Sequence, residues 1–481
     1  MFKKIFLTIL TLLFIISLGL SLFFYLTYKS GKLQKFVVNK VVEQVAKTDD
    51  GNLLGQSEIL QKVLGFAEPQ HYLMLFLNNT ELRPGGGFIG SYAVLKVENG
   101  KSEILKVEGT EILDGKSPKF ESVPPIQLAK HLKIKAWKFR DSNWSPDFSI
   151  ATEKSLELYE KENGLASGEI DAVIGITPTV FEGILEILGP ITVDGIEFNH
   201  ENFTEKLEYE VEYGYDEKGK DFEERKNIMG SLAKVILPKF KKDVFLNWEK
   251  YYELFESVIE QKQLMFYSKD SQVQDFLVAK KWLPKVEKTN GDYLMWVDAN
   301  LGAWKTDFSI ERKLEYKIDT TESGRYVGEV RMHYNHIGKF DWRTSRYLSY
   351  ARVYLPIGSE LIEVIGGEAI SQEYTESNFG VELDKQWFGV LVRIEPQTDK
   401  ELIFKFYLSD KITEQIKAGE YSLLVQKQLG SLDNGLTLDM NFANNVLSAN
   451  PFELEKNWGD SVYNLKTDLL IDREFSVRLE K

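Results

Sequence analysis

The feature that most constrains this sequence is an uncharged stretch near its start. Residues 5–28 contain no Asp, Glu, Lys or Arg. At about 1.5 Å per residue, a helix of this length exceeds the roughly 30 Å hydrocarbon core of a bilayer. Because the stretch ends in the bulky residues Phe23 to Leu26, a signal-peptidase site is not indicated. The sequence therefore predicts an uncleaved signal-anchor transmembrane helix over residues 1–29.

Charge bias does not orient this predicted helix, because lysines occur both before it and after it. A long domain behind a short N-terminal tail is usually translocated, so we expect the globular part outside the cell membrane. Apolar residues recur every four positions from Leu33 to Val45, which places them on one helical face. This spacing predicts a helical stalk within residues 30–66.

The composition limits the partners and the chemistry of the chain. Its 481 residues allow about three domains of roughly 150 residues each. Lys and Arg number 59 against 73 Asp and Glu, a formal net charge of −14, which is the wrong sign for a nucleic-acid ligand. No cysteine is present, so disulfides, iron–sulfur clusters and thiolate zinc sites are excluded.

A glycine-rich loop follows the first predicted strand, Tyr72 to Leu77. Gly85, Gly87 and Gly90 satisfy the dinucleotide pattern G-x-G-x-x-G, but that pattern needs a helix to begin directly after it. Ser91 to Val97 predicts a strand instead, so dinucleotide binding is excluded. Two interpretations stay open: the glycines form tight turns only, or they let a ligand approach the backbone.

The next part of the chain predicts an α/β layer structure. Ile170 to Ile176 is a candidate buried strand, Pro178 to Leu188 a helix and Ile191 to Val193 another strand. Residues 221–236 predict a further helix with Arg225 in its first turn, where the helix dipole disfavours a cation. The polar stretch 285–291 is the expected linker, which places this module at residues 67–290.

Residues 291–481 have a different pattern. Phe308 to Ile318 and Tyr326 to Tyr334 alternate apolar and polar residues, which is typical of an antiparallel β-sandwich. His333 and His336 would point to opposite faces of a strand, so they do not predict a metal site. Trp342 could stack on a sugar ring or fill the sandwich core, and core packing is the commoner use of aromatic residues.

Five segments together resemble the bacterial envelope family called domain of unknown function 4012. They are Asn78–Ser91, Arg140–Trp144, Ile170–Ile174, Leu188–Pro190 and Asp298–Gly302. That family is similar to the LytR-CpsA-Psr proteins. These are membrane-anchored phosphotransferases that move anionic glycopolymers from a polyprenyl-pyrophosphate carrier to peptidoglycan. Together with the uncharged run and the alternating patterns above, the resemblance predicts an α+β fold class: an N-terminal transmembrane helix, an α/β/α layered module of LytR-CpsA-Psr type and a C-terminal antiparallel β-sandwich.

The resemblance also implies a site. Arginines that cannot lose their protons would surround a pyrophosphate, and carboxylates would hold Mg²⁺ for phosphoryl transfer. By position along the chain, the implied catalytic residues are Arg83, Arg140, Asp141 and Arg225. The implied ligand-binding residues are Glu81, Gly86, Gly87 and Asn143, and the implied magnesium ligands are Glu81 and Asp141.

The sequence departs from the phosphotransferase pattern at acidic positions. Glu81 replaces the aspartate of the first loop, and Ile89 to Tyr92 replaces a segment that carries a Ser-Asp pair in the enzymes. Three functions therefore stay open. They are magnesium-dependent transfer of a polyprenyl-pyrophosphate-linked glycan to a cell-wall acceptor, binding of that carrier or glycan without turnover, and a non-catalytic surface scaffold or adhesion protein.

Overall fold

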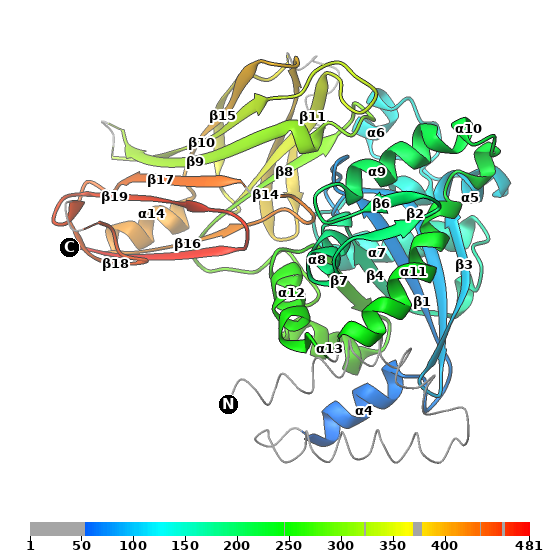
Figure 1. The fold of residues 1–481 in the computed structure, drawn as a ribbon. Helices are drawn as coiled ribbons and strands as arrows, with labels where there is room; N and C mark the ends of the chain where they lie inside the picture. The colour runs from blue at the N-terminus through cyan, green and yellow to red at the C-terminus, as the bar shows by residue number, and fades with distance from the viewer. Residues whose placement is uncertain (1–52, 245, 322–323, 369–377, 433, 455–456) are drawn as a thin grey trace.

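The computed structural model describes residues 53–481, apart from 245, 322–323, 369–377, 433 and 455–456 (Figure 1). The described part begins with helix α4 (Leu53–Val63), which leads into a mixed sheet. Beyond this sheet lies a pair of larger sheets built from the C-terminal half of the chain.

The first sheet has five strands in the order β3-β2-β1-β4-β7. Only β1 and β4 are parallel, and the other neighbours are antiparallel. Asn99 and Gly100 join β2 to β3 with φ of 50° and 72°, which are the positive values that a tight hairpin turn requires. The strands are β1 (Gln70–Asn78), β2 (Phe88–Glu98), β3 (Lys101–Gly109), β4 (Ile170–Ile176) and β7 (Leu264–Ser268).

Helices cover both faces of this sheet (Figure 1). On one face, the rings of Phe139, Tyr159 on α7 and Tyr92 on β2 meet with centroids 5.1–5.7 Å apart. The helices over the other face enclose the cavity described below. The helices around the sheet include α7 (Phe148–Lys161), α8 (Pro178–Leu188), α9 (Phe203–Tyr209), α11 (Asn227–Asp243), α12 (Trp248–Glu260) and α13 (Ser271–Ala279).

Shorter elements connect these layers. The strand, helix and strand predicted over 170–193 are confirmed as β4, α8 and β5. The helix predicted over 221–236 begins later than expected, because a separate 3₁₀ turn at Phe222–Glu224 is closed by a capping box from Asp221. The short elements are α5 (Thr110–Lys116), α6 (Ile126–His131), β5 (Ile191–Val193), β6 (Ile196–Phe198), α10 (Tyr215–Glu217) and the π-helix Glu210–Gly214.

The C-terminal half forms a two-sheet sandwich around its own apolar core. One sheet has the order β12-β15-β10-β9-β17-β19 and the other β13-β14-β11-β8-β16-β20-β18. The first comprises β9 (Ile310–Thr320), β10 (Tyr326–His336), β12 (Glu360–Ile365), β15 (Asp399–Tyr407), β17 (Gly435–Asn441) and β19 (Val462–Asp468). The second comprises β8 (Asp292–Asn300), β11 (Tyr347–Leu355), β13 (Phe379–Glu382), β14 (Lys385–Ile394), β16 (Glu420–Gln426), β18 (Val446–Asn450) and β20 (Arg473–Leu479), with α14 (Asp410–Lys417) leading into β16.

The fold class expected from the sequence was wrong as stated. It included a transmembrane helix within residues 1–29, which lie outside the described residues, as does the stalk up to residue 52. Among the helices that the structure describes, none is long and apolar enough to cross a membrane. The sandwich is also mixed rather than antiparallel, because β17 runs parallel to β9 and β16 parallel to β8.

Candidate functional site

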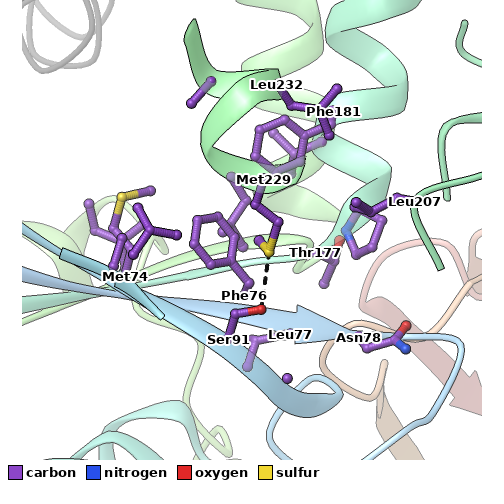
Figure 2. Close-up of a pocket in the computed structure, with 18 of the residues that line it drawn as sticks. Met74, Phe76, Leu77, Asn78, Ser91, Thr177, Phe181, Leu207, Met229 and Leu232 are labelled. Atoms are coloured by element: carbon purple, nitrogen blue, oxygen red, sulfur yellow. Dashed lines mark hydrogen bonds between the residues drawn. The ribbon is translucent and has the colours of Figure 1, made fainter. Parts of the chain in front are cut away.

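A cavity of about 660 Å³ lies between the five-stranded sheet and helices α8, α9, α11 and α12 (Figure 2). Side chains alternate between the two faces of a strand, so Tyr72, Met74 and Phe76 of β1 all line it. Phe181 of α8 and Met229 of α11 approach from the helical side (Figure 2). The walls of the cavity are therefore largely apolar.

The charged side chains of the cavity lie at one end. Along β1 the cavity extends from Tyr72 to Asn78, which are six residues or about 20 Å apart. On the antiparallel strand β2, Ser91 lies opposite Phe76, and its hydroxyl is 3.2 Å from the sulfur of Met229 (Figure 2). The charged residues of the lining gather where β1 enters the glycine loop; they are Glu81, Glu111, Arg140, Glu208, Glu212, Arg225, Lys226 and Lys305.

Ion pairs join the charged residues at this end. Glu111 lies 2.9 Å from Arg225 and 2.6 Å from Lys226, and Lys226 also donates to the carbonyl of Gly90. Glu212 lies 2.9 Å from Lys305 and 3.5 Å from Arg225. These cations already have carboxylate partners, so an anionic ligand would have to take the place of those carboxylates.

Two residues of this cluster, Lys226 and Glu111, have shifted pKa values. Burial lowers the pKa of Lys226 to about 8, although Glu111 opposes the shift. Burial alone would raise the pKa of Glu111, but the charges of Lys226 and Arg225 hold it below its ordinary value. The charge at this end of the cavity therefore changes within the range of pH at which proteins are ordinarily handled.

Arg83 does not line the cavity. Its buried guanidinium donates to the carbonyl of Asn300 at 2.6 Å and to Glu81 at 2.9 Å, and it lies 4.0 Å from Asp141. Of the three arginines expected around one anion, the structure brings only Arg140 and Arg225 to the same cavity. The reason is that the carbonyl of Asn300 and the carboxylate of Glu81 accept hydrogen bonds from the two terminal nitrogens of the Arg83 guanidinium within the protein.

The expected magnesium ligands, Glu81 and Asp141, do not suit a divalent ion. The Arg83 guanidinium already contacts both carboxylates, at 2.9 and 4.0 Å. Burial raises the pKa of both carboxyl groups, while Arg83 opposes the shift. Within the described residues, no group of three or more His, Cys, Asp or Glu side chains could hold a metal ion.

Gly86 and Gly87 of the loop face protein rather than an open site, whereas Gly90 lines the cavity. Gly86 and Gly87 have φ of 113° and 142°, and a Cβ on Gly87 would lie 2.5 Å from the carbonyl oxygen of Asn78. Asn143 donates to the Gly87 carbonyl at 2.6 Å. Neither these two glycines nor Asn143 lines the cavity. The geometry therefore favours the tight-turn interpretation over a ligand-binding backbone.

Arg140 and Asp141 are adjacent but have separate surroundings. Arg140 lines the cavity, pairs with Asp114 of α5 and keeps 39% of its side chain exposed. Asp141 is buried, and its backbone carbonyl accepts from the indole of Trp137 at 2.8 Å. They are therefore not a mutually neutralising surface pair.

Sequence reasoning missed several charged residues of the site. Lys226 could have been found, since it directly follows Arg225. Lys305 lies in the C-terminal half of the chain and nothing in its local sequence indicates a cavity. The other missed residues are Glu111, Glu208 and Glu212, which look like ordinary surface acids in the sequence.

The sandwich holds the glycine loop in place. Asp307 accepts from the backbone of Leu82 at 2.9 Å and from the side chain of Asn300 at 2.8 Å. Arg312 pairs with Asp307 at 2.5 Å and with Asp298 at 3.0 Å. All four polar side chains of this network are buried. The charged end of the cavity is therefore positioned by both halves of the chain.

Comparisons with known proteins identify one family. Residues 67–212 match the family described as "Protein of unknown function (DUF4012)". No curated protein matches the sequence.

One similar solved structure is a Legionella pneumophila protein described only as a candidate for nutrient binding. It is 7% identical, and the match covers 39% of this chain and 71% of that chain, with a TM-score of 0.23. A score this low supports no argument. The similarity to LytR-CpsA-Psr proteins stays a prediction, whereas the segment 67–212, which carries the glycine loop and Arg140, matches the DUF4012 family.

Proposed function

We propose that this protein binds a carrier lipid that bears a pyrophosphate-linked glycan. The lipid chain occupies the cavity, and the pyrophosphate lies at its charged end. The proposal rests on one cavity that combines both environments. It follows β1 for about 20 Å, with apolar side chains along most of this length and four cations at one end: Arg140, Arg225, Lys226 and Lys305.

The apolar part suits a hydrocarbon chain. A volume of about 660 Å³ lies within the usual range of small-molecule sites. Each buried methylene contributes about 0.8 kcal/mol, so a few isoprene units supply most of the affinity. Met74, Met229 and Leu232 offer side chains that adapt to an irregular chain.

The charged part suits a pyrophosphate. A guanidinium can make two parallel hydrogen bonds to phosphate oxygens. Arg225 now donates from Nε to Glu111 at 3.1 Å and from Nη1 to Glu212 at 3.5 Å. A pyrophosphate offers more acceptor oxygens than one carboxylate. The net electrostatic gain is the difference between the contacts made to the pyrophosphate and those made to the displaced carboxylates, and we expect it to add affinity beyond that of the lipid chain.

We favour binding without turnover over transfer to a cell-wall acceptor. Arg83 lies against Glu81 and Asp141, the carboxylates that would serve a magnesium-dependent reaction. The location outside the cell membrane stays a prediction, because the residues on which it rests lie outside the described part of the chain.

Titration of the full-length chain with farnesyl pyrophosphate, farnesol and inorganic pyrophosphate tests the proposal. We expect farnesyl pyrophosphate to bind tightest. Arg225→Gln should weaken it by about 10- to 100-fold and leave farnesol unchanged, because only charge-assisted bonds are lost. Arg393→Gln removes an exposed arginine paired with Glu368 and serves as the control.

Equal affinity for farnesol and farnesyl pyrophosphate would contradict the headgroup assignment, and absence of binding by both would contradict the whole proposal. Repeating the titrations with and without Mg²⁺ tests whether the protein also transfers the pyrophosphate-linked group. Release of phosphate that depends on Mg²⁺ would favour the enzyme over the binding protein.

The affinity for farnesyl pyrophosphate should depend on pH through Lys226. With a pKa of about 8, its ammonium is charged below that pH and neutral above it. Anion affinity should therefore begin to fall as the pH rises past about 8. Lys226→Arg should abolish this decline, because a guanidinium keeps its proton. A decline of the same size in both proteins would assign the pH dependence to another group.

A further inference from the structure

A group of aromatic side chains lies beside the charged end of the cavity. Glu208 and Glu212 line the cavity, whereas the residues that directly follow them, Tyr209 and Tyr213, do not. Residues four apart share a helical face, so the two tyrosines stand together on the outer side of α9 and the π-helix. Tyr213 is 42% exposed.

Trp342 completes this group from the loop between β10 and β11. Its ring is nearly perpendicular to both tyrosine rings, with centroids 5.3 Å from Tyr209 and 5.8 Å from Tyr213. The two tyrosine rings are 5.9 Å apart. We call these three residues the aromatic corner. Because each ring is held by the other two, little side-chain freedom is left to lose when a ligand binds.

Two links fix the aromatic corner relative to the cavity. Arg343, next to Trp342, donates to Glu208 at 2.6 Å, and the carboxylate of Glu208 lines the cavity. Glu212, next to Tyr213, accepts from Lys305 at 2.9 Å. A group attached to a pyrophosphate at the charged end would therefore emerge beside the aromatic corner.

We propose that the aromatic corner binds a pyranose ring of the glycan on the carrier lipid, an inference that rests on the function proposed above. The C–H faces of a pyranose are apolar and pack on aromatic rings, while its hydroxyl groups need acceptors. Glu217 lies at the edge of the corner, 2.7 Å from the hydroxyl of Tyr209. Glu210 lies on the π-helix that carries Tyr213. The Glu217 carboxylate can accept hydrogen bonds from sugar hydroxyls, whereas Glu210 pairs with Lys218.

The test compares farnesyl pyrophosphate with farnesyl-pyrophosphoryl N-acetylglucosamine and with the corresponding glucose compound, by calorimetric titration of the full-length chain. We expect at least one sugar to increase the affinity about tenfold. Tyr213→Ala should remove this gain and leave the affinity for farnesyl pyrophosphate unchanged. Tyr213→Phe should retain the gain, because it keeps the ring.

Phe452→Ala is the matched control. Phe452 is 74% exposed and follows β18, which lies well away from α9 in Figure 1. Its replacement should leave unchanged the increase in affinity that the sugar provides. If farnesyl pyrophosphate binds and neither sugar adds affinity, or if Tyr213→Ala keeps the gain, the aromatic corner is not the sugar site. If farnesyl pyrophosphate itself does not bind, the proposed function fails first.

Discussion

Replacing Ala233 with tryptophan should weaken the binding of both farnesyl pyrophosphate and farnesol by 100-fold or more. Ala233 lines the cavity from helix α11, so an indole there would occupy space that the lipid chain needs. Excluding about four methylenes at roughly 0.8 kcal/mol each corresponds to more than 100-fold in affinity. Because the cavity has room for the indole, the variant should still fold, which a thermal melt would verify.

Lys234→Trp provides the matched control for this prediction. Lys234 is the next residue on the same helix, but it is exposed and does not line the cavity. We expect wild-type affinity for both ligands. Wild-type affinity in Ala233→Trp as well would show that the lipid chain binds elsewhere.

Arg312→Leu should lower the free energy of unfolding by about 3–5 kcal/mol, the usual effect of removing one partner from a buried ion pair. Arg312 is 8% exposed, and its partners Asp298 and Asp307 are also buried. The substitution leaves two carboxylates in the protein interior without their cation. Urea denaturation at neutral pH measures the effect.

The loss should be smaller in mild acid. Burial raises the pKa of Asp307, and in the native protein Arg312 opposes that shift. Without Arg312, the Asp307 carboxyl has a higher pKa in the folded state than in the unfolded state, so the folded state binds this proton more tightly. Stability of the variant should therefore fall as the pH rises from about 4 toward neutrality. A loss independent of pH would indicate that lost packing, rather than unpaired charge, dominates.

Arg346→Leu is the control for Arg312. Arg346 pairs with Glu395 on the surface, and both side chains are close to half exposed. An exposed pair of this kind contributes at most about 1 kcal/mol. Equal destabilisation by the two substitutions would contradict the role assigned to the buried network.

Local patterns in the sequence predicted many of the elements. Strand β2, the turn at Asn99–Gly100 and the succession β4-α8-β5 follow from residues within a few positions of each other. The alternation over 308–334 likewise corresponds to β9 and β10. The parallel pairs in the sandwich were not predictable in this way, because they join strands that are distant in the sequence.

The surroundings of Arg83 show why the site was harder to predict. Nothing near this residue in the sequence indicates that the carbonyl of Asn300, more than two hundred positions away, accepts its hydrogen bond. Gly86 is enclosed in the same way, since a Cβ on Gly430 would lie 1.9 Å from its carbonyl oxygen. The glycine loop, whose sequence is compatible with a ligand-binding backbone, is instead packed against the sandwich.

The sequence by itself determined many of the local elements, the lack of cysteine and the match of residues 67–212 to the DUF4012 family. Only the tertiary structure decided that there is a cavity and which charges reach it. Hydrophobic periodicity reports which face of an element is buried, but not whether two buried faces touch or leave space between them. The meeting of Arg225 with Lys305 through Glu212 depends on how the two halves pack together.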